Sequence, residues 1–171
     1  MQPPEASAFS TPAPFPSLSG RVTPEWIDRN DHMNVSRYDS VFDAAESAFY
    51  AHCGIHGRYQ ARRRGLFRLE KHIRYQRELR LGAAIAVTTQ IIWTDLKRIQ
   101  IFHQLWNSGE GYRAATMECM AIHMDLEARR PARIDDPETR RRIEAMAAAH
   151  ATLAAPEGLG RRVARHPTPS G

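Results

Sequence analysis

Four polar side chains able to take part in acid–base or acyl-transfer chemistry lie within five residues of one another, at Asp28, Asn30, Asp31 and His32. Asn34 follows them at the position of a helix N-cap, because its amide oxygen can accept a hydrogen bond from a free backbone N–H of the first turn. Backbone dipoles make the start of a helix positive, which stabilises a nearby carboxylate in its charged form. The pattern therefore places a carboxylate beside a helix start.

Asp28 could act as a general base or as a nucleophile towards an acyl carbon. Taken alone, however, the spacing fits a loop aspartate that caps a turn more readily. His32 could likewise take part in acid–base or electrophilic chemistry, or it could have a structural role in the loop. The backbone N–H groups near Met33, Asn34 and Val35 are natural donors to a developing oxyanion or a thioester carbonyl.

A long helix must position this loop. Gly54 stands where a left-handed residue would end the helix, and about 20 residues of helix would be roughly 30 Å long. Asp43 and Glu46 lie on it and could face the same cavity, although carboxylates one turn apart also suit a solvated helix face. Apolar residues recur at helical spacing at Tyr38, Val41, Phe42, Ala45, Ala48 and Phe49.

From Leu66 onwards the hydrophobic period changes from 3.6 to 2, which indicates strands. Lys71 interrupts the apolar face of the first of these strands. Consecutive strands with short connections must be antiparallel, and a single long helix against such a sheet is an α+β arrangement. The predicted strands cover residues 21–26, 66–75, 84–94, 99–106 and 112–125, and a last helix runs from about 135 to 154.

The length of 171 residues suits one domain. Residues 1–19 and 155–171 are rich in Pro, Ser, Ala or Gly and are predicted to be disordered tails around a domain at 20–154. No apolar run approaches the ~18 residues of a membrane span. Two cysteines without a CxxC motif favour a reducing, cytoplasmic setting.

The net charge of +5 could indicate a nucleic acid, an anionic surface or a phosphate-bearing small molecule. The arginine clusters carry no interleaved aromatic residues, so we expect no nucleic-acid partner. His52, Cys53 and His56 straddle Gly54, which breaks a metal-ligand geometry, and no phosphate-binding glycine motif or GxSxG occurs. We therefore expect no metal and no cofactor, and we expect His103 and His123 to be packed within strands.

The segment Trp26-x-Asp28-x-Asn30-x-His32-Met33-Asn34-x-x-x-Tyr38, leading into a long apolar helix, resembles the hotdog-fold acyl-CoA thioesterases. It is most similar to the branch related to 4-hydroxybenzoyl-CoA thioesterase. Gly82 and the sequence Ala115-Thr116-x-Glu118 extend the resemblance over residues 20–135. It implies a long central helix wrapped by an antiparallel sheet of about five strands, with an extra C-terminal helix. It also implies a homodimer or homotetramer with active sites between protomers.

By this resemblance Asp28 matches the catalytic carboxylate, and His32 and Asn34 match the residues that shape the loop and the helix start. The family's usual glycine before the histidine is Asp31 here, and aspartate tolerates a left-handed backbone better than most residues. The predicted substrate contacts are Asn30, Met33, Val35, Tyr38 and Glu46. The predicted contacts to CoA phosphates, chosen from charge and position, are Arg62, Arg63, Arg64, Lys97 and Arg98.

The function that follows is hydrolysis of an acyl-CoA to a free acid and CoA. Some thioesterases with this motif resemble those of carnitine and betaine degradation, but the residues alone do not assign the acyl group. Three alternatives stay open at this point. They are an acyl-CoA hydratase or dehydratase on the same fold, a non-catalytic acyl-thioester binding protein, and a basic interaction protein.

Overall fold

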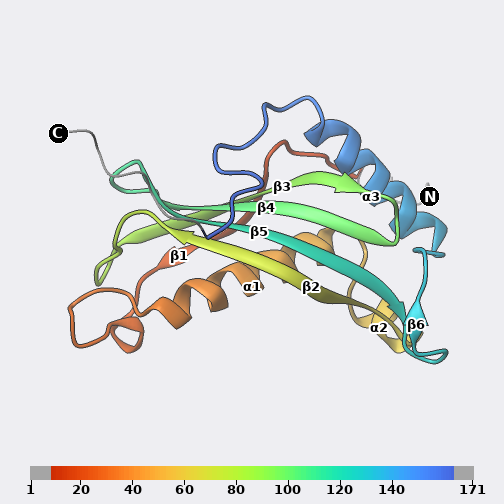
Figure 1. Cartoon of the computed structure of the whole chain (residues 1–171), viewed down its shortest axis with the longest axis horizontal. Helices are drawn as coiled ribbons and strands as arrows, with labels where there is room; N and C mark the ends of the chain where they lie inside the picture. The colour runs from red at the N-terminus through yellow and green to blue at the C-terminus, as the bar shows by residue number, and fades with distance from the viewer. Residues whose placement is uncertain (1–8, 164–171) are drawn as a thin grey trace, which may run out of the picture.

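The described part of the chain forms an antiparallel sheet of six strands with a long helix against one face (Figure 1). A computed structural model describes residues 9–163. The elements in chain order are β1 (Phe15–Arg21), the 3₁₀ helix η1 (Pro24–Trp26), α1 (Val35–His52), α2 (Gly57–Ala61), β2 (Arg64–Tyr75), β3 (Ala84–Thr94), β4 (Arg98–Asn107), β5 (Tyr112–Asp125), β6 (Arg130–Pro131) and α3 (Pro137–His150).

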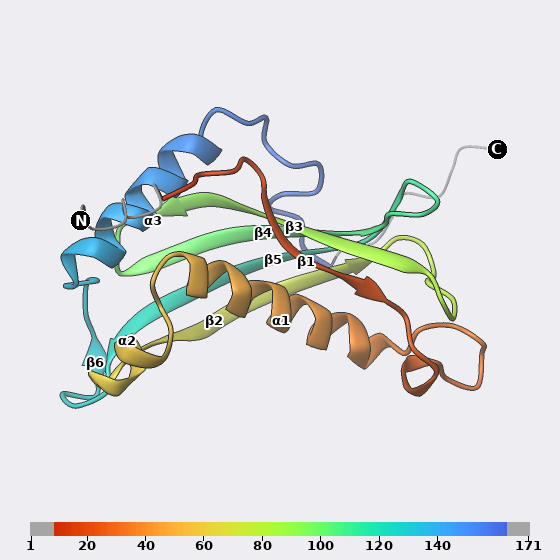
Figure 2. The same ribbon diagram turned by 180° about the vertical axis from the view of Figure 1, so that it is seen from behind.

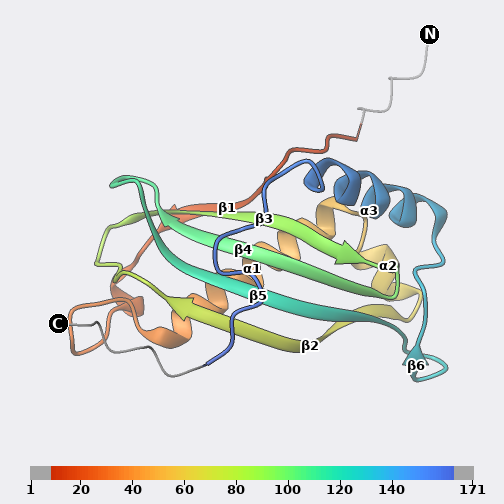
Figure 3. The ribbon, with the colours of Figure 1, turned by 45° about the horizontal axis from the view of Figure 1, so that its top comes forward.

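The strand order is β1-β3-β4-β5-β2, with β6 paired to β5. Strand β1 forms the edge of the sheet opposite β2 and is nearest the viewer when the molecule is seen from behind (Figure 2). Helix α1 lies under one face, and the segment after α3 crosses the other face (Figure 3). This is the predicted α+β hotdog arrangement, and the four long strands begin and end within two residues of their predicted limits.

Both predicted ends of α1 are confirmed. The Asn34 side chain accepts a hydrogen bond from the Ser36 amide at 2.9 Å and caps the helix. Gly54, after the C-cap Cys53, has a φ of +94°. A Cβ at this position would also lie 3.0 Å from Thr139 Oγ1, so both the backbone conformation and the packing of α3 favour glycine.

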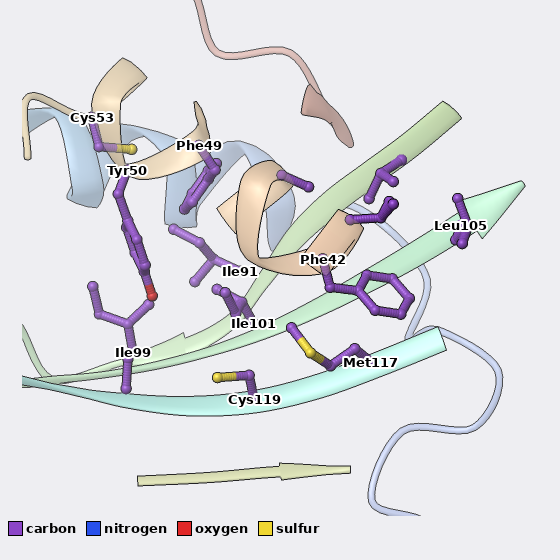
Figure 4. Close-up of a cluster of buried hydrophobic side chains, with 14 of the residues drawn as sticks. Phe42, Phe49, Tyr50, Cys53, Ile91, Ile99, Ile101, Leu105, Met117 and Cys119 are labelled. Atoms are coloured by element: carbon purple, nitrogen blue, oxygen red, sulfur yellow. The ribbon is translucent and has the colours of Figure 1, made fainter. Parts of the chain in front are cut away.

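The core forms between α1 and the central strands (Figure 4). Phe42 and Phe49 point from α1 towards the sheet and have no exposed surface. Both predicted packed histidines are fully buried. Thr89 Oγ1 lies 2.8 Å from His103 Nδ1, and burial lowers the pKa of His103 to about 3.

The start of the chain differs from the prediction. Residues 15–21 form β1, although the tail was predicted to extend to residue 19 and the first strand to begin at Arg21. The strand arises because the edge of β3 provides a pairing partner, with Phe15 opposite Thr89 and Arg21 opposite Ala84. Pro24 has no N–H to donate and instead opens a 3₁₀ turn. The first eight residues of the predicted tail lie outside the described residues.

The end of the chain also differs. Helix α3 ends at His150 rather than near residue 154, and the following segment contacts the outer face of the sheet without forming a helix or strand. Glu157 pairs with Arg113 at 2.8 Å, and the Gly160 amide donates to Glu118 at 2.7 Å. The predicted tail at 155–171 is thus partly placed on the sheet, and residues 164–171 lie outside the described part.

A bulge in β2 explains why Lys71 interrupts the apolar face. The pairing of β2 with β5 shifts register between Arg68 and Glu70, and a one-residue slip moves later side chains to the other face. Lys71 therefore faces α1, where it pairs with Asp39 at 2.5 Å. The seam between α1 and β2 consequently contains ion pairs of Arg68 and Lys71 as well as apolar contacts.

Candidate active site

A cavity of about 360 Å³ opens beside the N-terminal end of α1. Five of the predicted site residues line it, which supports the placement of the site at the helix start. The other four lining residues come from the end of β2 and the segment after it, to which no function was assigned from the sequence. The cavity is lined by Asp28, His32, Met33, Val35, Tyr38, Tyr75, Gln76, Arg77 and Glu78.

The loop that carries Asp28 is closed by hydrogen bonds to its own backbone. The Asp28 amide donates to the His32 carbonyl at 2.9 Å, and the Asn30 amide donates to Asp28 Oδ1 at 2.8 Å. Asp31 has a φ of +60° and donates its amide to the Asp28 carbonyl at 3.1 Å. Aspartate therefore occupies the left-handed position where the family has glycine, and the turn survives, as predicted.

Two of the three amides that were predicted to polarise a substrate carbonyl already donate hydrogen bonds within the protein. The Met33 amide donates to the Leu79 carbonyl at 2.7 Å, and the Asn34 amide donates to the Trp26 carbonyl at 2.8 Å. The Asn34 side chain accepts its cap hydrogen bond from the Ser36 amide. The cap therefore does not use the amide of Val35, the first residue of α1. Val35 also lines the cavity, so the structure narrows the candidate donor to this amide.

His32 is held from the far side of the cavity. Its Nε2 lies 2.6 Å from Glu78 Oε2, and Arg80 Nη2 lies 2.7 Å from Glu78 Oε1. The hydrogen bonds from Arg80, and in addition the charge of His32, lower the pKa of Glu78. A charged Glu78 thus ties the Asp28 loop to the segment that follows β2.

Two tyrosines form adjoining walls of the cavity. The ring centroids of Tyr38 and Tyr75 are 5.2 Å apart, and the ring planes meet at 85°. Tyr38 is buried, which raises the pKa of its phenol, whereas Tyr75 is 52% exposed at the edge of the sheet. The sequence contained one indication of Tyr75, because this residue belongs to the period-2 pattern of β2.

Three predicted site residues do not line this cavity. Asn34 is the helix cap, and the Asn30 side chain is exposed. Glu46 lines a second cavity of about 450 Å³ between the later turns of α1 and the start of β2. There it pairs with Arg68 at 2.5 Å, because its side of the helix faces β2 rather than the Asp28 loop.

The predicted phosphate contacts lie away from Asp28 within one protomer. The length of β2 puts Arg64 roughly 35 Å from Tyr75. Three of the five basic side chains are already in ion pairs, and Arg63 lines another cavity with Arg129. The ion pairs are Arg62 with Asp136, Arg64 with Asp125 and Asp135, and Arg98 with Asp95; Lys97 lies in the same turn as Arg98 and donates its amide to Asp95.

Among residues 9–163, His, Cys, Asp and Glu side chains nowhere gather in threes that could hold a metal ion. In the same part of the chain, no helix is both long enough and apolar enough to cross a membrane.

The fold and this cavity define a class of protein. A long helix enclosed by an antiparallel sheet is the arrangement of the hotdog fold, and Asp28 and Val35 line one cavity at the start of that helix. The sequence profile of the thioesterase-like superfamily matches residues 22–148.

Curated relatives agree with this class. A betainyl-CoA thioesterase of Pseudomonas aeruginosa is 38% identical over 147 residues, covering 85% of this chain and 92% of that protein. An L-carnitine dehydrogenase/betainyl-CoA thioesterase of Rhizobium meliloti is 30% identical over 159 residues, which cover 92% of this chain. The chain spans only 32% of the length of that second protein.

Solved structures agree as well. A Staphylococcus aureus protein in complex with CoA superposes with a TM-score of 0.83 at 28% identity, covering 92% of this chain and 99% of that one. A putative thioesterase of Pseudomonas putida gives 0.77 at 29% identity, covering 91% and 98%. The chain belongs to the thioesterase-like superfamily, and it is a thioester hydrolase by class.

Proposed function

We propose that the chain hydrolyses a CoA thioester and that Asp28 is its catalytic carboxylate. The observation that carries this proposal is the shared cavity of Asp28 and the first residue of α1, Val35. A trimethylammonium-bearing acyl group, as in the betainyl-CoA named for the relatives, is the first acyl group to test.

Two routes are compatible with this geometry. Asp28 removes a proton from a water molecule that adds to the carbonyl carbon, or it attacks that carbon and forms an anhydride that water then hydrolyses. In both routes the carbon–sulfur bond breaks, CoA leaves as the thiolate and a free acid forms. The Val35 amide and the positive end of α1 stabilise the negative charge that develops on the carbonyl oxygen.

Thiol release from a panel of acyl-CoAs tests the role of Asp28. Asp28→Asn should lower kcat by about 10²–10⁴-fold, the usual contribution of acid–base catalysis. Asp31→Asn is the matched control, because asparagine also tolerates the left-handed backbone, and it should stay within about threefold of wild type. Equal rates for Asp28→Asn and wild type would refute the assignment. Binding of CoA esters without any turnover would favour the non-catalytic alternative, and hydration of an enoyl-CoA would favour the hydratase.

We also propose a homodimer, alone or as half of a tetramer, formed through the edge of β2. This strand ends the sheet and exposes Phe67 (51%), Leu69 (57%) and Tyr75, and such an edge pairs readily with another strand. A two-fold axis across β2 makes the two copies of this strand run in opposite directions. The Arg64 end of one copy then lies beside the far end of the other copy. The basic residues 62–64 of one protomer then approach the other protomer's cavity, where CoA phosphates need positive charge.

The oligomeric state is measured by light scattering after size-exclusion chromatography. Leu69→Lys puts a charge on the pairing edge and should shift the dimer towards a monomer. Leu81→Lys, a similarly exposed leucine outside β2, should not change the mass. A wild-type monomer would contradict the proposal.

A cytoplasmic place of action is proposed as well. Cys53 and Cys119 are both buried free thiols, which persist in a reducing compartment. Fractionation of cells that express the tagged chain measures this directly, and recovery in an oxidising compartment would contradict it.

A further inference from the structure

A cavity of about 350 Å³ lies at the opposite end of β2 from the Asp28 loop. Arg63 comes immediately before β2 and Arg129 immediately before β6, and the Leu126 amide joins the two turns by donating to the Arg63 carbonyl at 2.8 Å. Figure 1 shows β6 and α2 at this end of the molecule and the loop before α1 at the other end. The cavity is lined by Arg63, Phe67, Met124, Leu126 and Arg129.

The lining of this cavity is positive without a carboxylate. Among the described residues, Arg62 and Arg64 are paired with aspartates, whereas Arg63 and Arg129 are in no ion pair. The Glu127 side chain is exposed and does not line the cavity. Each of four other cavities, of about 250 to 450 Å³, is lined by arginines together with carboxylates. The lining between Arg63 and Arg129 therefore favours an anion.

Both arginines have a left-handed backbone. The φ angle is +58° at Arg63 and +53° at Arg129. Glycine, asparagine and aspartate adopt this conformation at lower cost than arginine does. Residues in such conformations are held by the surrounding structure and are concentrated at ligand sites. A binding role accounts for arginine at two positions whose backbone favours other residues.

We propose that Arg63 and Arg129 bind the phosphorylated nucleotide end of CoA. This inference rests on the proposed thioesterase function and homodimer, and it assigns the phosphate contacts to the two arginines that are free of ion pairs. The nucleotide end of CoA carries a 3′-phosphate and a diphosphate on an adenosine. Guanidinium groups bind phosphates through two hydrogen bonds and stack on flat rings. Phe67, which is 51% exposed, gives the purine an apolar surface together with Met124 and Leu126.

The cavity and the carboxylate that share one CoA ester belong to different protomers. Within one protomer the two ends of β2 are roughly 35 Å apart. The two-fold pairing of β2 instead brings this end of one protomer beside the far end of the other strand. Asp28 of one protomer and Arg129 of the other then act on the same substrate molecule.

Substrates shortened at the nucleotide end test the phosphate contacts. The acyl-CoA that is turned over fastest in the panel is compared with the same acyl ester of 3′-dephospho-CoA and of pantetheine. Arg129→Gln should raise KM for the CoA ester about tenfold, the effect of losing a hydrogen bond to a charged group. KM for the pantetheine ester, which has no phosphate, should not change. Arg140→Gln is the matched control, because it neutralises an exposed arginine of α3 outside the cavity, and it should leave both KM values unchanged.

Two further measurements separate binding from folding. Arg129→Gly removes the charge and relieves the left-handed backbone, so it should raise KM for the CoA ester without lowering Tm. Calorimetry with adenosine 3′,5′-bisphosphate measures the site without turnover. Its affinity should fall about tenfold in Arg129→Gln and should fall in wild type as salt is added.

Hybrid dimers test whether the two residues act from different protomers. Asp28→Asn and Arg129→Gln chains with different tags are coexpressed, and the hybrid is purified through both tags. One of its two sites then combines an intact Asp28 with an intact Arg129, so the hybrid should show the wild-type KM at about half the wild-type kcat.

A hybrid with only the high KM of Arg129→Gln, or an unchanged KM for the CoA ester in Arg129→Gln itself, would overturn the proposal and leave the thioesterase function intact. Turnover of no CoA ester would instead defeat the proposed function. In that case equal binding of adenosine 3′,5′-bisphosphate by wild type and Arg129→Gln would overturn the nucleotide site separately.

Discussion

Replacing Arg68 by methionine separates a structural role of Glu46 from the predicted substrate contact. Glu46 is 7% exposed, and Arg68 Nη2 lies 2.5 Å from its carboxylate and 3.2 Å from that of Asp43. Burial raises the pKa of Glu46, and the Arg68 charge offsets part of this rise. In Arg68→Met the carboxylate must stay buried without a partner or take up a proton.

The size of the effect follows from this burial. Removing one partner of a buried ion pair costs about 3–5 kcal/mol, and the lower end applies because the Arg68 side chain is 24% exposed. We expect a loss of about 3 kcal/mol at pH 8, or roughly 6–12 °C in Tm for a chain of this size. Without Arg68 the folded-state pKa of Glu46 rises further above its usual 4.5. The folded variant then binds more protons than the unfolded chain, so its stability is retained at low pH and lost as pH rises.

Thermal and denaturant unfolding at pH 5 and pH 8 measure this, with Glu46→Gln and the double variant alongside. The double variant removes the unpaired charge and should regain most of the stability at pH 8. Lys71→Met is the control, because its partner Asp39 is 43% exposed and an exposed pair contributes at most about 1 kcal/mol. An Arg68→Met loss that is equal at both pH values, or a double variant no better than the single one, would refute the reasoning.

Three further predictions concern stability. Asp31→Ala should lose about 1 kcal/mol, because alanine lacks aspartate's tolerance of a φ of +60°, and Asp31→Gly should not; equal Tm values for the two would contradict this. Asn34→Ala should lose about 1 kcal/mol by removing the cap bond to Ser36, and an unchanged unfolding midpoint would count against it. Burial lowers the pKa of His103 to about 3, so the unfolded chain protonates this residue at a higher pH than the folded chain does. The free energy of unfolding should therefore be highest above pH 6.5 and should fall towards pH 3 by up to about 1.4 kcal/mol per pH unit. His103→Gln should flatten this part of the stability–pH curve, and an unaltered slope would show that another group titrates there.

The sequence alone was sufficient to predict α1 and the four long strands, because the signals for these elements are local. Asn34 caps through its own side chain, and Gly54 ends the helix through its own backbone. Alternation of apolar and polar residues marked β2, β-branched residues marked β3, and turn signals separated β3, β4 and β5. Burial of one face imposes that period on the residues themselves, so a short window of sequence contains it.

Other elements depend on partners distant in the sequence. The segment of β1 has no strand pattern of its own and is ordered by the edge of β3, nearly 70 residues later along the chain. The bulge in β2 is likewise a property of its pairing with β5. It turns Lys71 towards Asp39, which no inspection of β2 alone would predict.

The candidate site divides in the same way. By itself, the sequence determined the loop of Asp28, the capped start of α1 and the left-handed Asp31, because caps and tight turns are made by neighbouring residues. Only the tertiary structure decided the walls, bringing in Tyr75 and Glu78 and leaving Glu46 in a second cavity. The physical reason is that the walls of a cavity are set by strand register and helix rotation. These are fixed by packing between residues far apart in the chain, and no short stretch of sequence contains that information.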